Sequence, residues 1–215
     1  MKPRTRQPNP MTAIEMPEQR ALFVVVPKAA ASSIKVAIYE ATHHTEVGPD
    51  FQPNAVLISQ FTDARNKRYR GWLRFAVVRN PFDRLVSCWY EKIARRAIVF
   101  AGFKAYGWDV DMPFGAFVEA ACALPRECMD HHFRPQVDLL EYDGEWCVDF
   151  LMRFETLAAD WARLRLKLPC LGPLSYRNKR EHEPYRTYYT RDLWERVCHA
   201  YRDDIVRFGY EADRP

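Results

Sequence analysis

The chain has 215 residues, of which 48% are hydrophobic and 14% aromatic, a composition that supports a globular core and excludes a disordered protein. Its 32 Lys and Arg residues and 28 Asp and Glu residues give a formal net charge of +4. So small a charge does not by itself indicate nucleic-acid binding, which needs basic residues clustered on one face, but it suits a small anionic ligand.

Residues 1–18 are rich in proline and charge, and we expect a flexible tail there, followed by a single domain over residues 19–215. No stretch approaches the roughly 18 apolar residues of a membrane span. The six cysteines are widely spaced, which predicts reduced thiols in a soluble, cytoplasmic protein. The sequence indicates no particular oligomeric state.

Short apolar runs alternate with helical patterns along the domain. Strands are predicted at Leu22–Val26, Leu73–Val78 and Val148–Phe154. Helices are predicted at about residues 32–40, 81–95, 156–166 and 191–206, with the last one ending near Gly209. Strands and helices that alternate at this spacing predict an α/β fold with a mainly parallel sheet flanked by helices.

The stretch FVVVPKAAASSIK places a buried strand directly before a tight loop and a helix. Backbone N–H groups and the positive end of the helix dipole then meet at one point, which attracts phosphate or sulfate. Lys28 adds a mobile cation there, and Ser32 and Ser33 add hydroxyl donors. The structural alternative is that Pro27 ends the strand, Lys28 is solvated and a serine caps the helix. The loop has no glycine and does not match the Walker A pattern, which disfavours a Mg-ATP site of the usual kind. The order of strand, tight loop and helix still leads us to expect a P-loop-like domain.

A second junction between a strand and a helix lies in FAVVRNPFDRLVSCWYEK. The run Asn80–Asp83 has the spacing of an N-cap, a helix-initiating proline and a capping-box acid. Arg79 ends the strand and is expected at the same sheet edge as Lys28, with Ser87 further along the helix. A strand-end arginine is often only solvated, and a helical serine often bonds its own backbone. Cations at two junctions nevertheless favour a ligand with two anionic ends.

These stretches resemble the sulfotransferases that use 3′-phosphoadenosine 5′-phosphosulfate (PAPS), in particular the carbohydrate sulfotransferases of the chondroitin and HNK-1 type. PKAAASSIK is similar to their 5′-phosphosulfate loop, and RNPFDRLVSCWYEK is similar to their 3′-phosphate motif R-x-P-[FY]-x-R-L-x-S. HFRPQ, MRFETL and YYTRDLWERVCHAYRDDIVRFGYE resemble later blocks of the family, so the resemblance covers about residues 22–211. Ser33 stands where Asn or Thr is usual, and the Golgi membrane anchor is missing, which leads us to expect a soluble member of bacterial type.

The resemblance implies sulfuryl transfer from PAPS to an acceptor hydroxyl, expected on a carbohydrate, with adenosine 3′,5′-bisphosphate as product and no metal. Lys28 would stabilise charge on the departing oxygen. Arg79 and Ser87 would hold the 3′-phosphate, Ser87 would also restrain Lys28 until the acceptor arrives, and Arg84 would support the junction. The 5′-phosphosulfate would bind the loop residues Pro27, Lys28, Ala29, Ala30, Ala31, Ser32 and Ser33.

The acceptor hydroxyl needs a general base, for which the sequence offers two candidates. His132 is favoured, because a histidine titrates near working pH, and Glu155 is the second candidate. Some related enzymes use a histidine that precedes the 3′-phosphate motif as the base. This sequence has no histidine between His44 and that motif, which begins at Arg79. Cys128, His131 and His132 are close in sequence, but no second group of metal ligands accompanies them, so no metal is expected.

Residues Ile98–Pro113 are expected to bind the acceptor, because two glycines and mixed polarity interrupt their helical periodicity. Two other functions remain as alternatives. A nucleotide kinase or NTPase would need a glycine-bearing phosphate loop and a carboxylate for Mg²⁺, and neither is found. A non-catalytic nucleotide- or carbohydrate-binding module is opposed by the joint presence of Lys28, Arg79 and Ser87.

Overall fold

The computed structural model describes residues 11–95, 98, 100–175 and 183–210. Their contacts divide into two compact units. The first, here called the sheet unit, contains the described residues of 11–78 and 138–175, and the second, the helical unit, contains those of 79–137 and 183–210. The single domain expected over residues 19–215 concerns both units together and stays a prediction.

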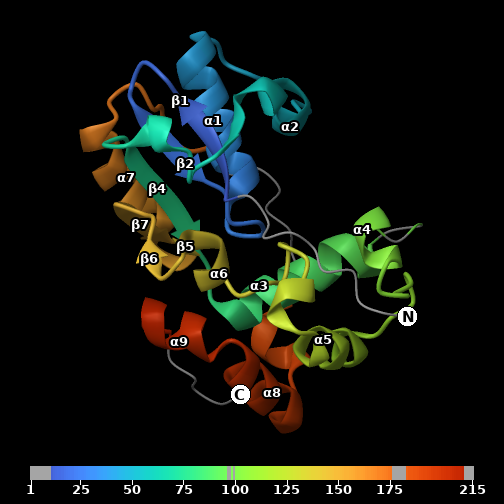
Figure 1. The fold of residues 1–215 in the computed structure, drawn as a ribbon. Helices are drawn as coiled ribbons and strands as arrows, with labels where there is room; N and C mark the ends of the chain where they lie inside the picture. Colours follow the sequence, from blue (N-terminus) through green and yellow to red (C-terminus); the bar gives the residue numbers. More distant parts are fainter. Residues whose placement is uncertain (1–10, 96–97, 99, 176–182, 211–215) are drawn as a thin grey trace. The chain divides into compact units, whose positions relative to one another are not determined.

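A five-stranded sheet in the order β3–β1–β2–β4–β7 forms the centre of the sheet unit (Figure 1). Its strands are β1 (Thr12–Met16), β2 (Ala21–Val24), β3 (Phe61–Asp63), β4 (Leu73–Val78) and β7 (Phe150–Arg153). β4 pairs in parallel with β2 and with β7, whereas β1 pairs antiparallel with β2 and with β3. The predicted α/β class is therefore confirmed, with parallel pairing among the three predicted strands.

Apolar composition explains why β2 and β4 form the middle of the sheet. All four residues of β2 and the last four of β4 are buried, as expected for parallel strands that are covered on both faces. The rings of Phe23 and Phe75 stack between these strands with their centroids 5.5 Å apart. Core packing thus stabilises the two central strands, β2 and β4, from whose C-terminal ends the two junctions start.

The strand β1 was not predicted, because Thr12–Met16 fell inside the expected flexible tail. Three of its five side chains, those of Ala13, Ile14 and Met16, are fully buried. Burial of these apolar side chains offsets the entropy lost when the backbone is ordered. The tail prediction is therefore wrong for Thr12–Met16, and residues 1–10 lie outside the described part of the chain.

The other elements of the sheet unit connect or cover the strands, and α7 packs against β7. They are α1 (Ala31–His43), α2 (Pro53–Val56), α7 (Leu157–Lys167), the hairpin β5 (Glu141–Tyr142) and β6 (Glu145–Trp146), and the 3₁₀ turns Leu57–Gln60, Lys67–Tyr69 and Phe154–Thr156. The predicted helices at residues 32–40 and 156–166 are confirmed as α1 and α7, with α1 three residues longer at its C-terminal end. The short α6 (Val137–Leu140) lies where the chain passes from the helical unit to the sheet unit.

The helical unit has an aromatic core in which Phe82 and Trp194 stack at 3.7 Å between ring centroids. Its elements are α3 (Pro81–Trp89), a π-helical turn (Tyr90–Ala94), α4 (Ala101–Lys104), α5 (Phe114–Ala123), α8 (Arg191–Ala200), α9 (Arg202–Phe208) and the 3₁₀ turns Arg126–Cys128 and Tyr185–Tyr188. α8 packs against α5 and α3 (Figure 1). The predicted helix at residues 191–206 is divided into α8 and α9 at Tyr201, and Gly209 ends it in a left-handed conformation, as expected.

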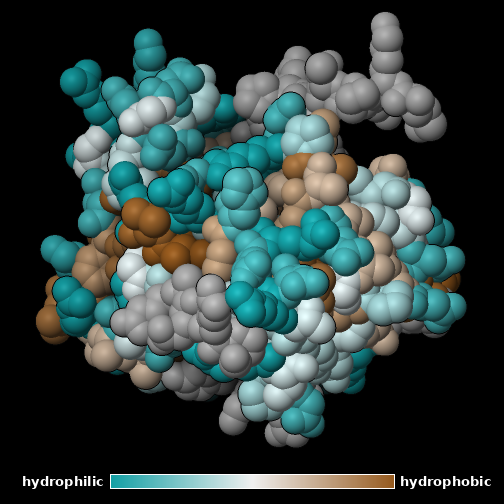
Figure 2. All heavy atoms as spheres, turned by 90° about the horizontal axis from the view of Figure 1, so that it is seen from below, coloured by the Kyte–Doolittle hydropathy of each residue, from teal (hydrophilic) through white to brown (hydrophobic). Residues whose placement is uncertain are grey.

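The largest exposed apolar side chains come from different elements. They are those of Val56, Ile98, Tyr142, Leu151, Leu166 and Val206. Figure 2 likewise shows hydrophobic residues in separate groups among hydrophilic ones on the face that it presents. No helix of the described residues is both long and apolar enough to cross a membrane.

Candidate functional site

The loop between β2 and α1 turns through two left-handed residues that are not glycine. Lys28 has a φ of 70°, and Ala30 has a φ of 57° and a ψ of 15°. This conformation costs an L-residue roughly 1–2 kcal/mol, and strain of this kind clusters at ligand sites. Ala31, which follows Ala30, is the first residue of α1. A left-handed residue next to a right-handed one directs successive N–H groups into a common concavity, which suits an anion.

The serines at the start of α1 do not cap the helix. The N-cap is Ala30, whose side chain forms no cap hydrogen bond. Ser32 and Ser33 lie inside that turn, and Ser33 is buried. The structural alternative, in which a serine caps the helix, is therefore wrong. The first N–H groups of an α-helix have no partner within the helix, so an anion is a suitable acceptor for them.

The second junction places Arg79 directly after β4, as the first residue of the helical unit. The Nε of Arg79 donates to Asp83 Oδ2 at 2.7 Å, and both side chains are largely buried. The carboxylate of Asp83 thus orients the guanidinium. Its expected role as a capping-box acid stays a prediction. The predicted N-cap is confirmed, because the Oδ1 of Asn80 accepts from the N–H of Phe82 at 3.0 Å. Ser87 lies four residues beyond Asp83, on the same face of α3, and is partly buried.

Gln136 holds the backbone of Arg79 from both sides. Its Oε1 accepts from the Arg79 N–H at 2.9 Å, and its Nε2 donates to the Arg79 carbonyl at 2.8 Å. The fully buried carboxylate of Asp204 in α9 accepts from the Gln136 N–H at 2.8 Å, from the Gln136 Nε2 at 3.1 Å and from the Val137 N–H at 2.9 Å. Burial raises the pKa of Asp204, although these donors oppose the shift. The anion-binding candidate Arg79 is thus supported by a continuous buried network.

Sequence analysis did not predict this network. HFRPQ and the C-terminal block that contains D-x-x-x-FGY were each noted as similar to blocks of one family, but neither Gln136 nor Asp204 was given a role. The structure shows that Gln136 of the first block and Asp204 of the second are hydrogen-bonded across 68 residues of sequence. In the sequence, Asp204 shares the apolar helix face of Tyr201, Ile205 and Phe208, and a carboxylate on such a face indicates burial but not its partner.

Arg84 is almost completely buried, with 1% of its surface exposed. It donates from Nη1 to the Arg134 carbonyl at 2.7 Å and from Nη2 to the His131 carbonyl at 2.9 Å. Burial lowers the pKa of Arg84, while the charge of Asp204 raises it. These bonds fasten α3 to the segment at residues 131–134 and agree with the supporting role that was expected.

His132, the favoured base, is paired with a carboxylate that sequence analysis missed. Its Nδ1 lies 2.6 Å from Asp130 Oδ1, and its backbone N–H donates to the same oxygen at 2.9 Å. The rings of Phe100 and His131 lie 5.3 Å and 4.2 Å from the imidazole. Burial lowers the pKa of His132 to about 4, which outweighs the hydrogen bond to Asp130. The imidazole is consequently neutral near neutral pH, as a general base must be.

The same segment contains a possible set of metal ligands. The ligand atoms of Asp130, His131 and His132 all lie within 4.8 Å of one another. The sequence grouped Cys128 with the two histidines, but Asp130 takes that place in the structure. A metal bound through Nδ1 of His132 would displace the hydrogen bond between that nitrogen and Asp130 Oδ1.

Glu155, the second candidate base, is exposed in the 3₁₀ turn after β7. The neighbouring carboxylate of Asp160 accepts from the Arg153 N–H at 3.1 Å and from the Thr156 hydroxyl at 2.8 Å. Glu155 belongs to the sheet unit together with the loop at residues 27–33, whereas Arg79, Ser87 and His132 belong to the helical unit.

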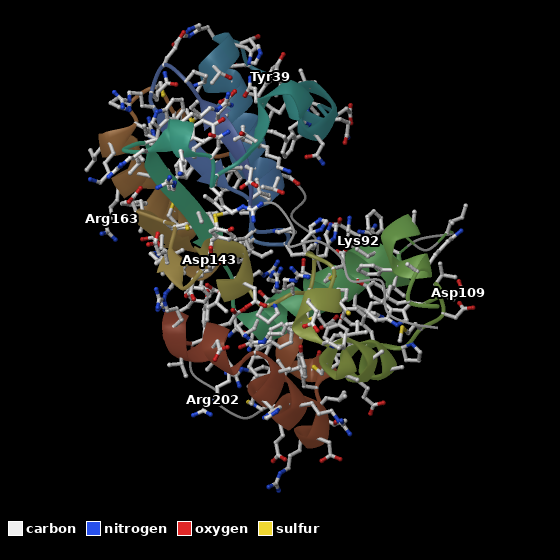
Figure 3. The ribbon with its side chains drawn as sticks, viewed as in Figure 1. Tyr39, Lys92, Asp109, Asp143, Arg163 and Arg202 are labelled. Carbon is white, nitrogen blue, oxygen red and sulfur yellow. The ribbon has the colours of Figure 1, made fainter. Side chains whose placement is uncertain are left out.

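The segment Ile98–Pro113 contributes much of its aromatic content to the core of the helical unit. Phe103 is fully buried and Trp108 is nearly so, and the Met112 carbonyl accepts from the indole of Trp89 at 2.8 Å. Asp109 is exposed and points away from the neighbouring side chains (Figure 3). Acceptor binding by this segment stays a prediction.

Comparison with known proteins identifies the family. The profile described as "Sulfotransferase family" matches residues 12–211, which include both junctions and the segment of His132. Searches of curated proteins and of solved structures give no match. Since the match covers most of the chain, the protein belongs to the sulfotransferase family.

Proposed function

We propose that the protein is a PAPS-dependent O-sulfotransferase that acts on a hydroxyl of a carbohydrate. Membership of the family supports sulfuryl transfer in general. The observation that carries the donor assignment is the loop Pro27–Ser33, in which two left-handed residues precede an α-helix that has no side-chain cap. We regard this loop as a glycine-free counterpart of a P-loop.

The residues of the loop fit a phosphosulfate group. Ala29, Ala30 and Ala31 have side chains small enough for an anion to reach the backbone, and the helix dipole of α1 favours negative charge. The ammonium of Lys28 adds a full positive charge at the mouth of the loop. We therefore assign the 5′ end of the donor to Pro27–Ser33.

The topology of the sheet supports a donor with a second anionic group. β2 and β4 are parallel neighbours, so the chain leaves both strands at the same edge of the sheet. The loop follows β2, and Arg79 follows β4 directly. We assign the 3′-phosphate to Arg79 and Ser87, because a guanidinium and a hydroxyl are both suitable donors to phosphate.

The chemistry of the transfer gives each residue a defined task. PAPS supplies an activated sulfuryl group. Lys28 stabilises the charge that develops on the departing phosphate oxygen, an interaction that strengthens towards the transition state and so raises the rate. His132 accepts the proton of the acceptor hydroxyl as the bond from oxygen to sulfur forms, with Glu155 as the alternative base. This scheme assigns no step to a metal.

Calorimetric titration with adenosine 3′,5′-bisphosphate tests the donor assignment, with 5′-AMP and ATP plus Mg²⁺ as comparison ligands. We expect selective binding of the bisphosphate, and loss of that selectivity in Arg79→Ala. Lys28→Ala should weaken bisphosphate binding less than it lowers turnover. Its charge-matched control is Lys67→Ala, which removes an exposed lysine of the same unit and should change neither quantity. Preference for Mg-ATP would favour a nucleotide kinase. Binding of the bisphosphate without turnover of any acceptor would favour a non-catalytic module.

A further inference from the structure

Asp130 holds the backbone and the ring of His132 with one oxygen atom. Its Oδ1 accepts from the His132 N–H at 2.9 Å and lies 2.6 Å from the His132 Nδ1. Only 5% of the Asp130 side chain and 13% of the His132 side chain are exposed. Because both contacts share one acceptor atom, the imidazole has little freedom to rotate away from it.

This geometry selects one tautomer of the neutral imidazole. A carboxylate only accepts hydrogen bonds, so the proton of the ring lies on Nδ1 and the lone pair on Nε2. The hydrogen bond from Nδ1 to Asp130 holds the pKa of that carboxyl below its usual range, although burial alone would raise it. Asp130 is therefore ionised under the conditions in which His132 is neutral.

Hydrogen bonds on both sides of His132 keep the segment in place. Arg84 binds the carbonyl of His131, and the hydroxyl of Tyr201 donates to the carbonyl of Phe133 at 2.5 Å. The carbonyl of Asp130 itself accepts from the N–H of Arg134 at 2.8 Å. The position of the imidazole is thus set before any ligand binds, which is a requirement for efficient proton transfer.

Two phenylalanine rings, the ammonium of Lys92 and the imidazole of His131, whose Nδ1 lies 3.7 Å from Asp130 Oδ1, surround the pair. The rings of Phe100 and Phe103 lie 5.3 Å and 6.3 Å from the imidazole, and the ammonium of Lys92 lies 4.6 Å from the centre of the Phe100 ring. Figure 3 shows Lys92 on the segment that follows α3. In such surroundings a carboxylate stabilises an adjacent imidazolium more strongly than it would in water.

We infer that Asp130 is a positioning residue that holds Nδ1 of His132 protonated, so that Nε2 can take the proton of the acceptor hydroxyl. The inference rests on the proposed function. During transfer the bond from the acceptor oxygen to sulfur forms, and the bond from sulfur to the 5′-phosphate oxygen breaks. The hydroxyl proton moves to Nε2, and the resulting imidazolium is paired with the Asp130 carboxylate.

A metal ion bound by Asp130, His131 and His132 is the competing interpretation. If Nδ1 of His132 were a ligand, it would have to lose its proton, and the hydrogen bond to Asp130 would be broken. For a metal bound through Nδ1, the two interpretations therefore predict opposite states of that nitrogen atom. Nitrogen NMR of the full-length protein labelled with ¹⁵N-histidine observes that state directly, without any activity measurement.

The first measurement records the tautomer of His132 in the wild type, Asp130→Asn and Asp130→Ala. We expect the Nδ1–H form in the wild type. Asp130→Asn should keep it, because the backbone N–H of His132 orients the amide oxygen towards the position of Oδ1. Asp130→Ala should release it. The Nε2–H form in the wild type, or displacement of the Nδ1 proton by Zn²⁺ at one equivalent, would overturn the inference.

The second measurement compares turnover with donor binding in the same variants. We expect Asp130→Ala to lower kcat by about 10²–10⁴-fold, the range for loss of a general base, with the affinity for adenosine 3′,5′-bisphosphate unchanged. Asp130→Asn should fall between it and the wild type, because it keeps the tautomer but loses the charge. Unchanged kcat in Asp130→Ala, with bisphosphate still bound, would refute the role of Asp130 and leave the proposed function intact.

Two control variants separate this role from general damage to the segment. Glu127→Gln removes an exposed negative charge three residues before Asp130, and we expect wild-type kcat. Tyr201→Phe removes the hydrogen bond to the carbonyl of Phe133 and lowers stability without changing the tautomer of His132. A fall in kcat in Tyr201→Phe as large as that in Asp130→Ala would overturn the inference. Absence of bisphosphate binding to the wild type would overturn the proposed function and with it the role of the base.

Discussion

Replacement of Gln136 by leucine tests whether the buried network positions Arg79. Leucine is close to glutamine in size but cannot form hydrogen bonds. The substitution removes the bond from the Arg79 N–H to Oε1, and it removes the bonds from Nε2 to the Arg79 carbonyl and to Asp204. The backbone N–H of Gln136 still donates to Asp204, so the carboxylate keeps two of its three donors.

The expected loss of stability follows from the two backbone groups of Arg79. A buried polar group that loses its partner costs about 1–3 kcal/mol, so two groups cost roughly 2–6 kcal/mol. This is a large part of the roughly 5–15 kcal/mol by which a typical domain is stable. We expect Tm to fall by on the order of 10 °C, because about 2–4 °C is lost per kcal/mol in chains of this size.

Thermal unfolding and calorimetric titration with adenosine 3′,5′-bisphosphate should be measured on the same samples. We expect the Kd of Gln136→Leu to rise by about tenfold, equivalent to roughly 1.4 kcal/mol, because the guanidinium of Arg79 is no longer held by its backbone. Gln52→Leu, at an exposed glutamine, should change neither quantity. An unchanged Tm would refute the stabilising role of the network. A lower Tm with an unchanged Kd would refute the positioning of Arg79.

Three further changes test individual residues. Lys28→Ala should lower kcat by about 10²–10³-fold, the loss typical of one charge-stabilising donor, and should change donor affinity less; an effect on KM alone would contradict the role of Lys28. Asn80→Ala should lower the free energy of unfolding by about 1 kcal/mol, the usual contribution of an N-cap, as measured by urea unfolding. His132 has a folded-state pKa of about 4, below its value in the unfolded chain, so the unfolded state binds its proton first as the pH falls. The wild type should therefore lose up to about 3 kcal/mol relative to His132→Gln as the pH falls from neutral towards 4, and parallel pH profiles of the two proteins would contradict a buried, neutral His132.

The parts of the fold that could be predicted are those in which local patterns and tertiary packing agree. β4 was predicted with the correct limits, because Leu73–Val78 is a continuous apolar run. β1 was missed, because TAIEM is short, contains polar residues and follows a proline-rich stretch. Its place in the sheet depends on pairing with both β2 and β3, and that pairing leaves no local signal in the sequence.

The residues of the candidate site also fall into those that local sequence indicates and those that depend on long-range contacts. Lys28, Arg79 and His132 could be named as candidates because each lies in a stretch with a chemical interpretation of its own, and their roles stay predictions. Gln136 and Asp204 were not, because their role exists only through a contact between residues far apart in the chain. Burial creates that role: an aspartate that would be unremarkable on the surface must find donors when it is enclosed.

The loop at residues 27–33 contains two left-handed residues but no glycine, and this combination has consequences for its rigidity. Glycine reaches a left-handed conformation without strain, but it also makes the unfolded chain more flexible and the loop less rigid. Lys28 and Ala30 adopt that conformation as ordinary L-residues, so the surrounding structure must hold them there. β2 on one side and the 13-residue helix α1 on the other supply that restraint. If this loop binds the 5′-phosphosulfate as proposed, its backbone is restrained before the donor binds, at the cost of strain that a glycine-rich loop avoids.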